Sequence, residues 1–225
     1  MTQDVVPTIE YRGRKTHRAD GHARRQALLE ATLRLIQRDG VRAVRHRAVA
    51  QEAQVPLAAT TYYFKDINEL ISDAFTLFAE QSLTENRALE NAAFTALNEL
   101  GADRFSVAGR EKLAQLLSQF SLHHIRRQVA ARDARLIEHS FRVEALRNDK
   151  LAADVRLPYS ATITLIRQFF QQLQTRDPEA DSELIFGTMM HCEYQLLLSG
   201  ESRTLWDLTE RSLHRLYSAL LAMES

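Results

Sequence analysis

The scarcity of chain-turning residues constrains the fold of this sequence more than any other feature. The chain of 225 residues contains only seven glycines and four prolines, and no segment alternates apolar and polar residues strictly enough for a strand. Apolar residues make up 45% of the chain, which is enough to bury a core. The sequence therefore predicts an all-α fold, in one large domain or two modest ones.

The glycines and prolines that are present mark the expected helix ends. Apolar residues at helical spacing predict a first helix from about Asp20, which Gly40 is expected to end. Two short helices are expected over about 46–53 and 57–63, because only Gln54, Val55 and Pro56 separate them. Further helices are expected over 66–101, 107–130, 132–148, 158–175, 178–199 and 203–223.

The charge of the chain is unevenly distributed although its net charge is zero. Residues 1–65 carry 12 basic and 6 acidic side chains, a balance of +6, so residues 66–225 carry 17 basic and 23 acidic side chains, a balance of −6. This asymmetry indicates that only the N-terminal region meets a polyanion. The alternative is a solvated charged face without a partner.

The two short helices, preceded by a longer helix and a basic segment, form the pattern of a helix-turn-helix unit. Val49, Ala50 and Ala53 give the first short helix an apolar side, and Val55 is expected to be buried in the turn. The second helix carries threonines and tyrosines. Their hydroxyl groups can bond phosphates, while threonine methyl groups and Leu57 can contact a thymine methyl group.

The run from about Arg24 to Phe75 resembles the DNA-binding domain of the TetR (tetracycline repressor) family of bacterial regulators. The landmarks that carry the resemblance are Gly40, Val49, Ala50, Glu52, Ala53, Val55, Phe64 and Leu70. Four positions depart from the family pattern: Arg45 replaces a capping Ser or Thr, Gln54 a turn glycine, Tyr63 a histidine and Ile67 a lysine. The first two departures affect local geometry, and the last two affect which groups reach phosphate.

The resemblance implies three parts: a basic flexible arm over 1–18, a three-helix DNA-binding domain over 19–66, and a larger helical domain over 67–225 that binds an effector and dimerises. In this reading the arm tracks the DNA backbone or enters the minor groove, or else is a solubilising tail. One tyrosine of the pair at 62 and 63 contacts phosphate, or one ring belongs to the core. The expected DNA-binding residues are Arg12, Arg14, Lys15, Arg18, Arg45, His46, Arg47, Leu57, Thr60, Thr61, Tyr62, Tyr63 and Lys65.

Polar residues on apolar helix faces of the acidic region are candidates for orienting a small molecule. The alternative is that each one is satisfied inside the protein, for example Glu144 bonded to an arginine. These polar types identify no ligand class. With the aromatic residues beside them, the candidates are His123, His124, Arg127, Phe141, Glu144, Tyr159, Thr162 and Phe170.

The helices expected over 178–199 and 203–223 carry many apolar residues, so the first of them must be covered on more than one side. The resemblance implies a homodimer through these two helices; the alternative is that both lie in the centre of a monomer. A single cysteine and no metal-ligand or cofactor motif predict a cytoplasmic chain with no metal, no cofactor and no membrane partner.

Together these observations predict a sequence-specific DNA-binding regulator, most simply a repressor that a small-molecule effector releases from a palindromic operator. Its partners would be double-stranded operator DNA, an effector and a second copy of the chain. The alternatives are an all-α enzyme whose basic N-terminal region binds an anionic substrate, and a family member that acts as an activator or adaptor.

Overall fold

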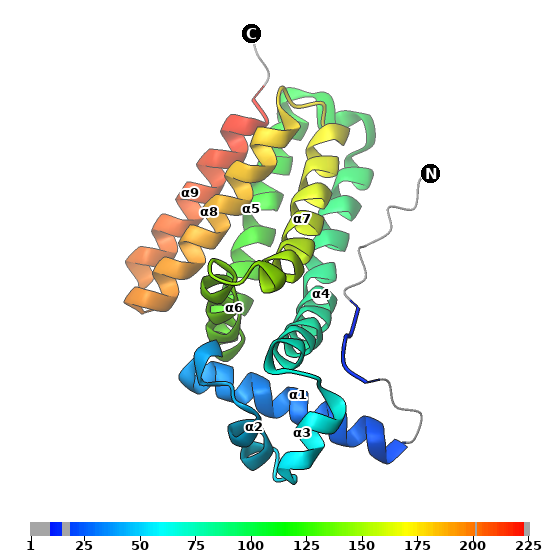
Figure 1. Cartoon of the computed structure of the whole chain (residues 1–225). Helices are drawn as coiled ribbons and strands as arrows, with labels where there is room; N and C mark the ends of the chain where they lie inside the picture. Colours follow the sequence, from blue (N-terminus) through cyan, green and yellow to red (C-terminus); the bar gives the residue numbers. More distant parts are fainter. Residues whose placement is uncertain (1–9, 15–18, 201, 223–225) are drawn as a thin grey trace. The chain divides into compact units, whose positions relative to one another are not determined.

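The computed structural model describes residues 10–14, 19–200 and 202–222, with the backbone alone at residues 83–90. All regular elements within these residues are helices (Figure 1), so the predicted all-α fold is confirmed. In chain order they are α1 (Ala19–Asp39), a 3-10 turn (Val41–Ala43), α2 (His46–Glu52), α3 (Leu57–Tyr63), α4 (Ile67–Leu100), a 3-10 turn (Gly101–Phe105), α5 (Val107–Ala130), α6 (Arg132–Ala145), α7 (Asp149–Gln172), α8 (Pro178–Ser199) and α9 (Arg203–Leu220).

The expected helix ends are confirmed where a capping residue defines them. Gly40 follows α1 with φ 79°, and Gly200 follows α8 with φ 78°, a backbone region that favours glycine. Asp177 caps α8 by accepting a 3.0 Å hydrogen bond from the Ala180 N–H, with Pro178 in the first turn.

The expected start of α7 at Pro158 is wrong, because this helix begins at Asp149 and contains Pro158. A proline removes one helical hydrogen bond, but the helix has a cap upstream, where Asn148 accepts from the Leu151 N–H at 3.2 Å. Leu151 and Phe170, near the two ends of α7, are almost completely buried. Their burial offsets the bond that the proline cannot make. The preceding helix, α6, ends at Ala145 in two turn hydrogen bonds rather than at 148.

The chain divides into two compact units. Unit 1 comprises Met1–Thr84 and Asp133–Tyr159 and contains α1, α2 and α3, the first part of α4, nearly all of α6, and the first part of α7. Its core includes Phe64, Leu70 and Phe141, all fully buried. The Phe141 ring lies 5.1 Å from that of Phe75, in an edge-to-face arrangement that aromatic pairs favour.

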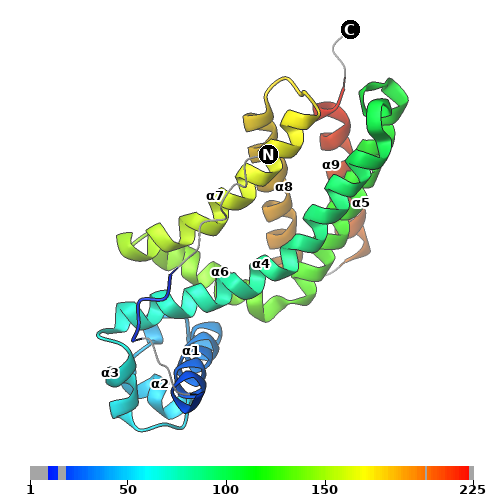
Figure 2. The ribbon, with the colours of Figure 1, turned by 90° about the vertical axis from the view of Figure 1, so that its right-hand side faces the viewer.

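Unit 2 comprises Glu85–Arg132 and Ser160–Ser225. Within it α5, α8 and α9 pack side by side (Figures 1 and 2). Leu113, Phe170 and Ile185 belong to one apolar cluster, and Ile125 and Leu213 to a second.

One buried polar contact joins α5 to α9. The hydroxyl groups of Ser121 and Tyr217 lie 2.8 Å apart. Burial raises the pKa of Tyr217 to about 12, against the weaker opposing effect of the Ser121 hydrogen bond.

The compact unit that contains α1, α2 and α3 extends beyond the expected domain boundary at residue 66. Side chains of α4, such as Leu70 and Phe75, and of α6, such as Phe141, complete the core on which α1 and α3 pack. The expected boundary at residue 66 lies inside this compact unit.

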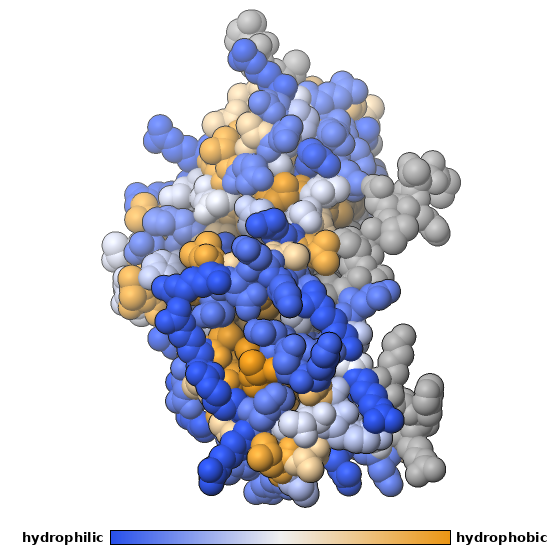
Figure 3. All heavy atoms as spheres, in the orientation of Figure 1, coloured by the Kyte–Doolittle hydropathy of each residue, from blue (hydrophilic) through white to orange (hydrophobic). Residues whose placement is uncertain are grey.

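Hydrophilic side chains cover most of the molecular face in Figure 3, with apolar side chains in small patches among them. Over the described residues, no helix is long and apolar enough to cross a membrane.

Candidate nucleic-acid interface

The turn between α2 and α3 has the geometry that two short crossing helices require. Gln54, which stands where the resemblance expects glycine, adopts φ 55°. The following N–H, that of Val55, donates to the Ala50 carbonyl at 3.0 Å and closes the turn. Gln54 therefore adopts the left-handed backbone conformation that glycine would adopt, and its side chain makes this conformation modestly less favourable in free energy.

The side chains of α3 divide between the interior and the surface of unit 1. Leu57 and Tyr62 are 50% and 54% exposed, and Thr61 is also exposed. Tyr63 lies in the core. Thr60 is 0% exposed, and its hydroxyl donates to the Leu57 carbonyl at 2.8 Å. Thr60 and Tyr63 were both expected to contact DNA, but their side chains are buried in unit 1 and do not lie on its exposed surface.

Cationic side chains surround the start of α2. Arg45, the N-cap residue, makes no side-chain cap, and its guanidinium instead donates to the carbonyls of Arg42 and Val44, both at 2.7 Å. Arg47 is exposed, whereas His46 is half-buried and its Nδ1 has no hydrogen-bond partner within the described part of the chain. Arg45 and Arg47 therefore remain candidates for phosphate contacts, while His46 is less accessible.

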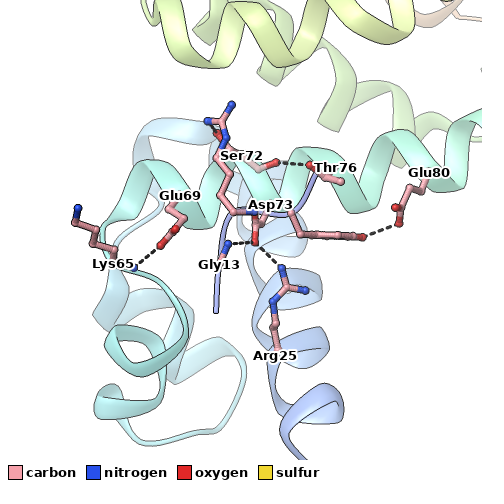
Figure 4. Close-up of polar contacts among 10 residues, drawn as sticks. Gly13, Arg25, Lys65, Glu69, Ser72, Asp73, Thr76 and Glu80 are labelled. Atoms are coloured by element: carbon pink, nitrogen blue, oxygen red, sulfur yellow. Dashed lines mark hydrogen bonds and ion pairs between the residues drawn. The ribbon is translucent and has the colours of Figure 1, made fainter. Parts of the chain in front are cut away.

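The segment after α3 is fixed by the cap of α4. The Asp66 carboxylate accepts hydrogen bonds from the N–H groups of Asn68 and Glu69, at 2.8 and 2.9 Å, and these bonds lower the pKa of Asp66. Glu69 in turn accepts from the Lys65 N–H (Figure 4). The hydrogen bonds that Glu69 and Asp66 accept thus fix the backbone at Lys65 and at the residue after it, while the Lys65 side chain stays exposed.

Residues 11–14 of the expected flexible arm are packed, which corrects the expectation for these four residues. The Arg12 and Gly13 N–H groups donate to the Asp73 carboxylate of α4, at 2.7 and 2.9 Å. The Arg12 guanidinium bonds Ser72 at 2.9 Å and Asp154 at 2.5 Å. Arg14 lies at the end of α3, and its N–H donates to the Tyr63 carbonyl at 2.8 Å. Lys15 and Arg18, also expected to bind DNA, lie outside the described residues.

The predicted ligand-binding residues fall into both units. Unit 1 contains Phe141, Glu144 and Tyr159. The Phe141 ring belongs to the core of unit 1, and Glu144 pairs with Arg42 at 3.3 Å, as the alternative interpretation expected. Tyr159 is exposed.

The other predicted ligand-binding residues lie in unit 2. Phe170 is buried in the core, whereas His123 and Arg127 are exposed. The half-buried His124 contacts Gln128, with 3.3 Å between their Nε2 atoms, and Thr162 is also half-buried. The described contacts do not bring these five residues together around one cavity. Across the described part of the chain, no group of three or more His, Cys, Asp or Glu residues could hold a metal ion.

The residues that sequence reasoning missed are those that bind residues 10–14. Asp73 pairs with Arg25 and also accepts hydrogen bonds from the backbone of the segment. Glu80 accepts a hydrogen bond from the Tyr11 hydroxyl at 2.6 Å. In the sequence, the one available signal was that Ser72, Asp73 and Thr76 stand among the apolar residues of the run 70–79, and the structure buries every residue of this run. A carboxylate in such a run requires a partner, but the sequence does not identify it.

Several of the solved structures that share this fold are TetR-family transcriptional regulators. A TetR regulator from Haloarcula marismortui matches with a TM-score of 0.64 at 12% identity, over 89% of this chain and 100% of that one. A TetR-family member from Streptomyces coelicolor matches with a TM-score of 0.54 at 21% identity, over 86% and 97%. The multidrug binding protein EbrR, solved in complex with proflavin, matches with a TM-score of 0.52 at 22% identity, over 86% and 99%.

These matches establish that the chain has the TetR-family fold. No protein-family model matches the chain, and no curated protein matches it.

Proposed function

We propose that this protein is a sequence-specific DNA-binding transcriptional regulator. The observation that carries the proposal is the exposed face of α3, on which Leu57, Thr61 and Tyr62 project. Other side chains of the same helix-turn-helix, such as Val49 and Tyr63, belong to the core of unit 1. An exposed face of this kind, about two helical turns long, fits the major groove, where a leucine or threonine methyl contacts thymine and hydroxyl groups contact bases or phosphates.

Uncompensated positive charge near this face supports the same proposal. Arg47 and Lys65 are exposed, and neither side chain has an ion pair among the described residues. Cations placed beside a recognition helix contact phosphates and fix the register of the helix on the duplex. We assign phosphate contacts to Arg45, Arg47 and Lys65, and base contacts to Leu57 and Thr61.

The test is the affinity of variants for a duplex recovered by selection from random DNA. Thr61→Ala and Tyr62→Ala are expected to weaken specific binding by roughly tenfold or more, since a good base or charged contact contributes about 1–3 kcal/mol. The matched control is Arg156→Ala, which removes an exposed cation of α7 in the same unit. Unchanged specific affinity in both α3 variants would refute the placement of the recognition face.

We further propose a homodimer formed through α8 and α9. The large apolar residues Leu184, Tyr194 and Leu198 are exposed on α8, and at 100° per residue they fall within an arc of about 80°. Such a stripe suits a symmetric partner surface, and a two-fold dimer places two recognition helices one turn of B-DNA apart, about 34–36 Å.

Leu198→Glu is expected to shift the molar mass from dimer to monomer in sedimentation and to abolish binding to a palindromic duplex. Leu146→Glu is the control, because Leu146 is also exposed but lies in unit 1. A wild-type chain that sediments as a monomer would refute the proposal and favour α8 and α9 as central helices of a monomer.

We also propose that a small-molecule effector binds unit 2 and releases the protein from DNA. The support is the fold, which the chain shares with EbrR, a protein solved with bound proflavin. Effector and DNA must then weaken each other's binding by the same factor. Calorimetric titration of DNA-free protein with proflavin, repeated on the protein–DNA complex, tests this reciprocity. A compound that binds equally well to both forms is not an effector.

A further inference from the structure

Residues 11–14 form a segment that we call the N-terminal strap. It is hydrogen-bonded at one end to α3, the proposed recognition helix, and in its middle to the buried carboxylate of Asp73. Asp73 is fully buried and accepts hydrogen bonds from three donors: the Arg12 N–H at 2.7 Å, the Gly13 N–H at 2.9 Å and the Arg25 guanidinium at 2.5 Å. Figure 4 shows Gly13 and Arg25 approaching this carboxylate together. A buried carboxylate with three donors fixes the backbone at Arg12 and Gly13.

Glycine at position 13 is required by the space around it. A Cβ atom there would lie 2.7 Å from a ring carbon of Phe64 and 2.8 Å from an Asp73 carboxylate oxygen. Neither neighbour can easily yield, because both are completely buried. Any side chain at position 13 therefore displaces the strap from Asp73.

The next residue, Arg14, stands beside the recognition helix. Its N–H donates to the Tyr63 carbonyl at 2.8 Å, and its guanidinium lies 4.3 Å from the centroid of the Tyr62 ring. This is the distance of a cation–π contact. The stacked Arg14 and Tyr62 side chains are both exposed.

The arginines of this region differ in whether they already have an acceptor. The guanidiniums of Arg12 and Arg25 pair with Asp154 and Asp73. The Arg14 guanidinium has no carboxylate or carbonyl acceptor among the residues that the structure describes. Its planar set of N–H donors, held beside a phenol, matches the geometry of a phosphate.

We propose that the strap is a fixed part of the DNA-binding surface, in which Arg14 and Tyr62 together bind one phosphate of the DNA backbone. Asp73 and Gly13 are positioning residues, because they hold the strap where Arg14 stacks on Tyr62. This inference rests on the proposed DNA-binding function and extends it from the helix-turn-helix to a segment that precedes α1 in the chain.

A double-mutant cycle tests the inference. The specific affinity and its salt dependence are measured for wild type, Gly13→Ala, Arg14→Ala and the double variant, on the duplex recovered by selection. Arg14→Ala is expected to weaken binding by roughly tenfold and to reduce the salt slope by about one for each chain bound. Gly13→Ala should weaken binding nearly as much, and the double variant no further, because both changes remove the same contact.

Asp73→Asn provides a second variant in the same cycle in case Gly13→Ala does not fold, and thermal unfolding of each protein identifies that case. Arg156→Ala is the matched control for the loss of one exposed arginine, and its salt slope is expected to stay at the wild-type value.

Two results would overturn the inference while leaving the proposed function intact. One is an Arg14→Ala variant with unchanged affinity and slope. The other is a Gly13→Ala or Asp73→Asn variant whose loss of affinity multiplies with the loss caused by Arg14→Ala. The strap would then influence binding independently of the Arg14 contact. A wild-type chain that enriches no duplex would instead overturn the proposed function itself, and with it this inference.

Discussion

Replacing Asp73 should destabilise unit 1 far more than replacing any exposed carboxylate. Asp73→Ala removes the only described acceptor of the Arg25 guanidinium, whose side chain is 14% exposed, and leaves the Arg12 and Gly13 N–H groups without a partner. Breaking a buried ion pair by removing one partner costs about 3–5 kcal/mol. The two backbone groups add little to this cost, because the strap can detach and expose them to water. We therefore expect a total loss of about 3–5 kcal/mol.

Urea unfolding followed by circular dichroism measures this loss. Because domains are stable by only about 5–15 kcal/mol, Asp73→Asn is included as a milder change that keeps the volume and one acceptor oxygen. Asp39→Asn is the control: its partner Arg38 is exposed, so the unfolding midpoint should not move. A loss below about 1 kcal/mol in Asp73→Ala would show that water satisfies the Arg25 guanidinium and the two N–H groups as well as Asp73 does.

Three further predictions concern the cores of the two units. Phe141→Ala should cost about 3–5 kcal/mol in urea unfolding, because Phe141 is fully buried; a near-neutral effect would return it to the ligand-binding candidates. Burial raises the pKa of the Cys192 thiol, so the native protein at pH 8 should react slowly with a disulfide reagent and the unfolded protein quickly; equal rates would contradict the burial. The pKa of Tyr217, raised to about 12, contributes stability that is intact below pH 10, where unfolded tyrosine starts to ionise, and is lost as pH rises through 12. Tyr217→Phe should reduce this alkaline loss in unfolding measured between pH 9 and 12, and an identical pH profile would refute the assignment.

The elements could be predicted where local signals define both ends. Pro56 fixes the start of α3, and Asp177 with Gly200 fixes both ends of α8. The start of α7 was misplaced because Pro158 resembles a helix start in the sequence. Tertiary burial of the flanking residues outweighed that local preference, and no periodicity in the sequence reports it.

The candidate site was predictable as a segment but not residue by residue. Thr60 and Thr61 are chemically identical neighbours, yet only Thr61 is exposed. Thr60 satisfies its hydroxyl by bonding the Leu57 carbonyl of its own helix, so it can be buried without a distant partner and polarity alone cannot identify its face.

The strap was unpredictable for a different reason. The bonds that fix Arg12 and Gly13 join them to Asp73, about 60 residues further along the chain. Helical periodicity relates only residues within a turn or two of one another. The basic residues beside Gly13 therefore have the same sequence pattern whether the segment is packed or is an unpacked tail.

Selection of tight binders from random duplex DNA by the purified protein, at a stated salt concentration, decides whether this protein reads a DNA sequence. We expect enrichment of a near-palindromic sequence whose half-sites lie one helical turn apart and which two chains bind. The Thr61→Ala, Tyr62→Ala double variant should lose that enrichment. A pool that remains random after repeated rounds with the effector-free wild-type protein would contradict the claim that the exposed face of α3 reads DNA.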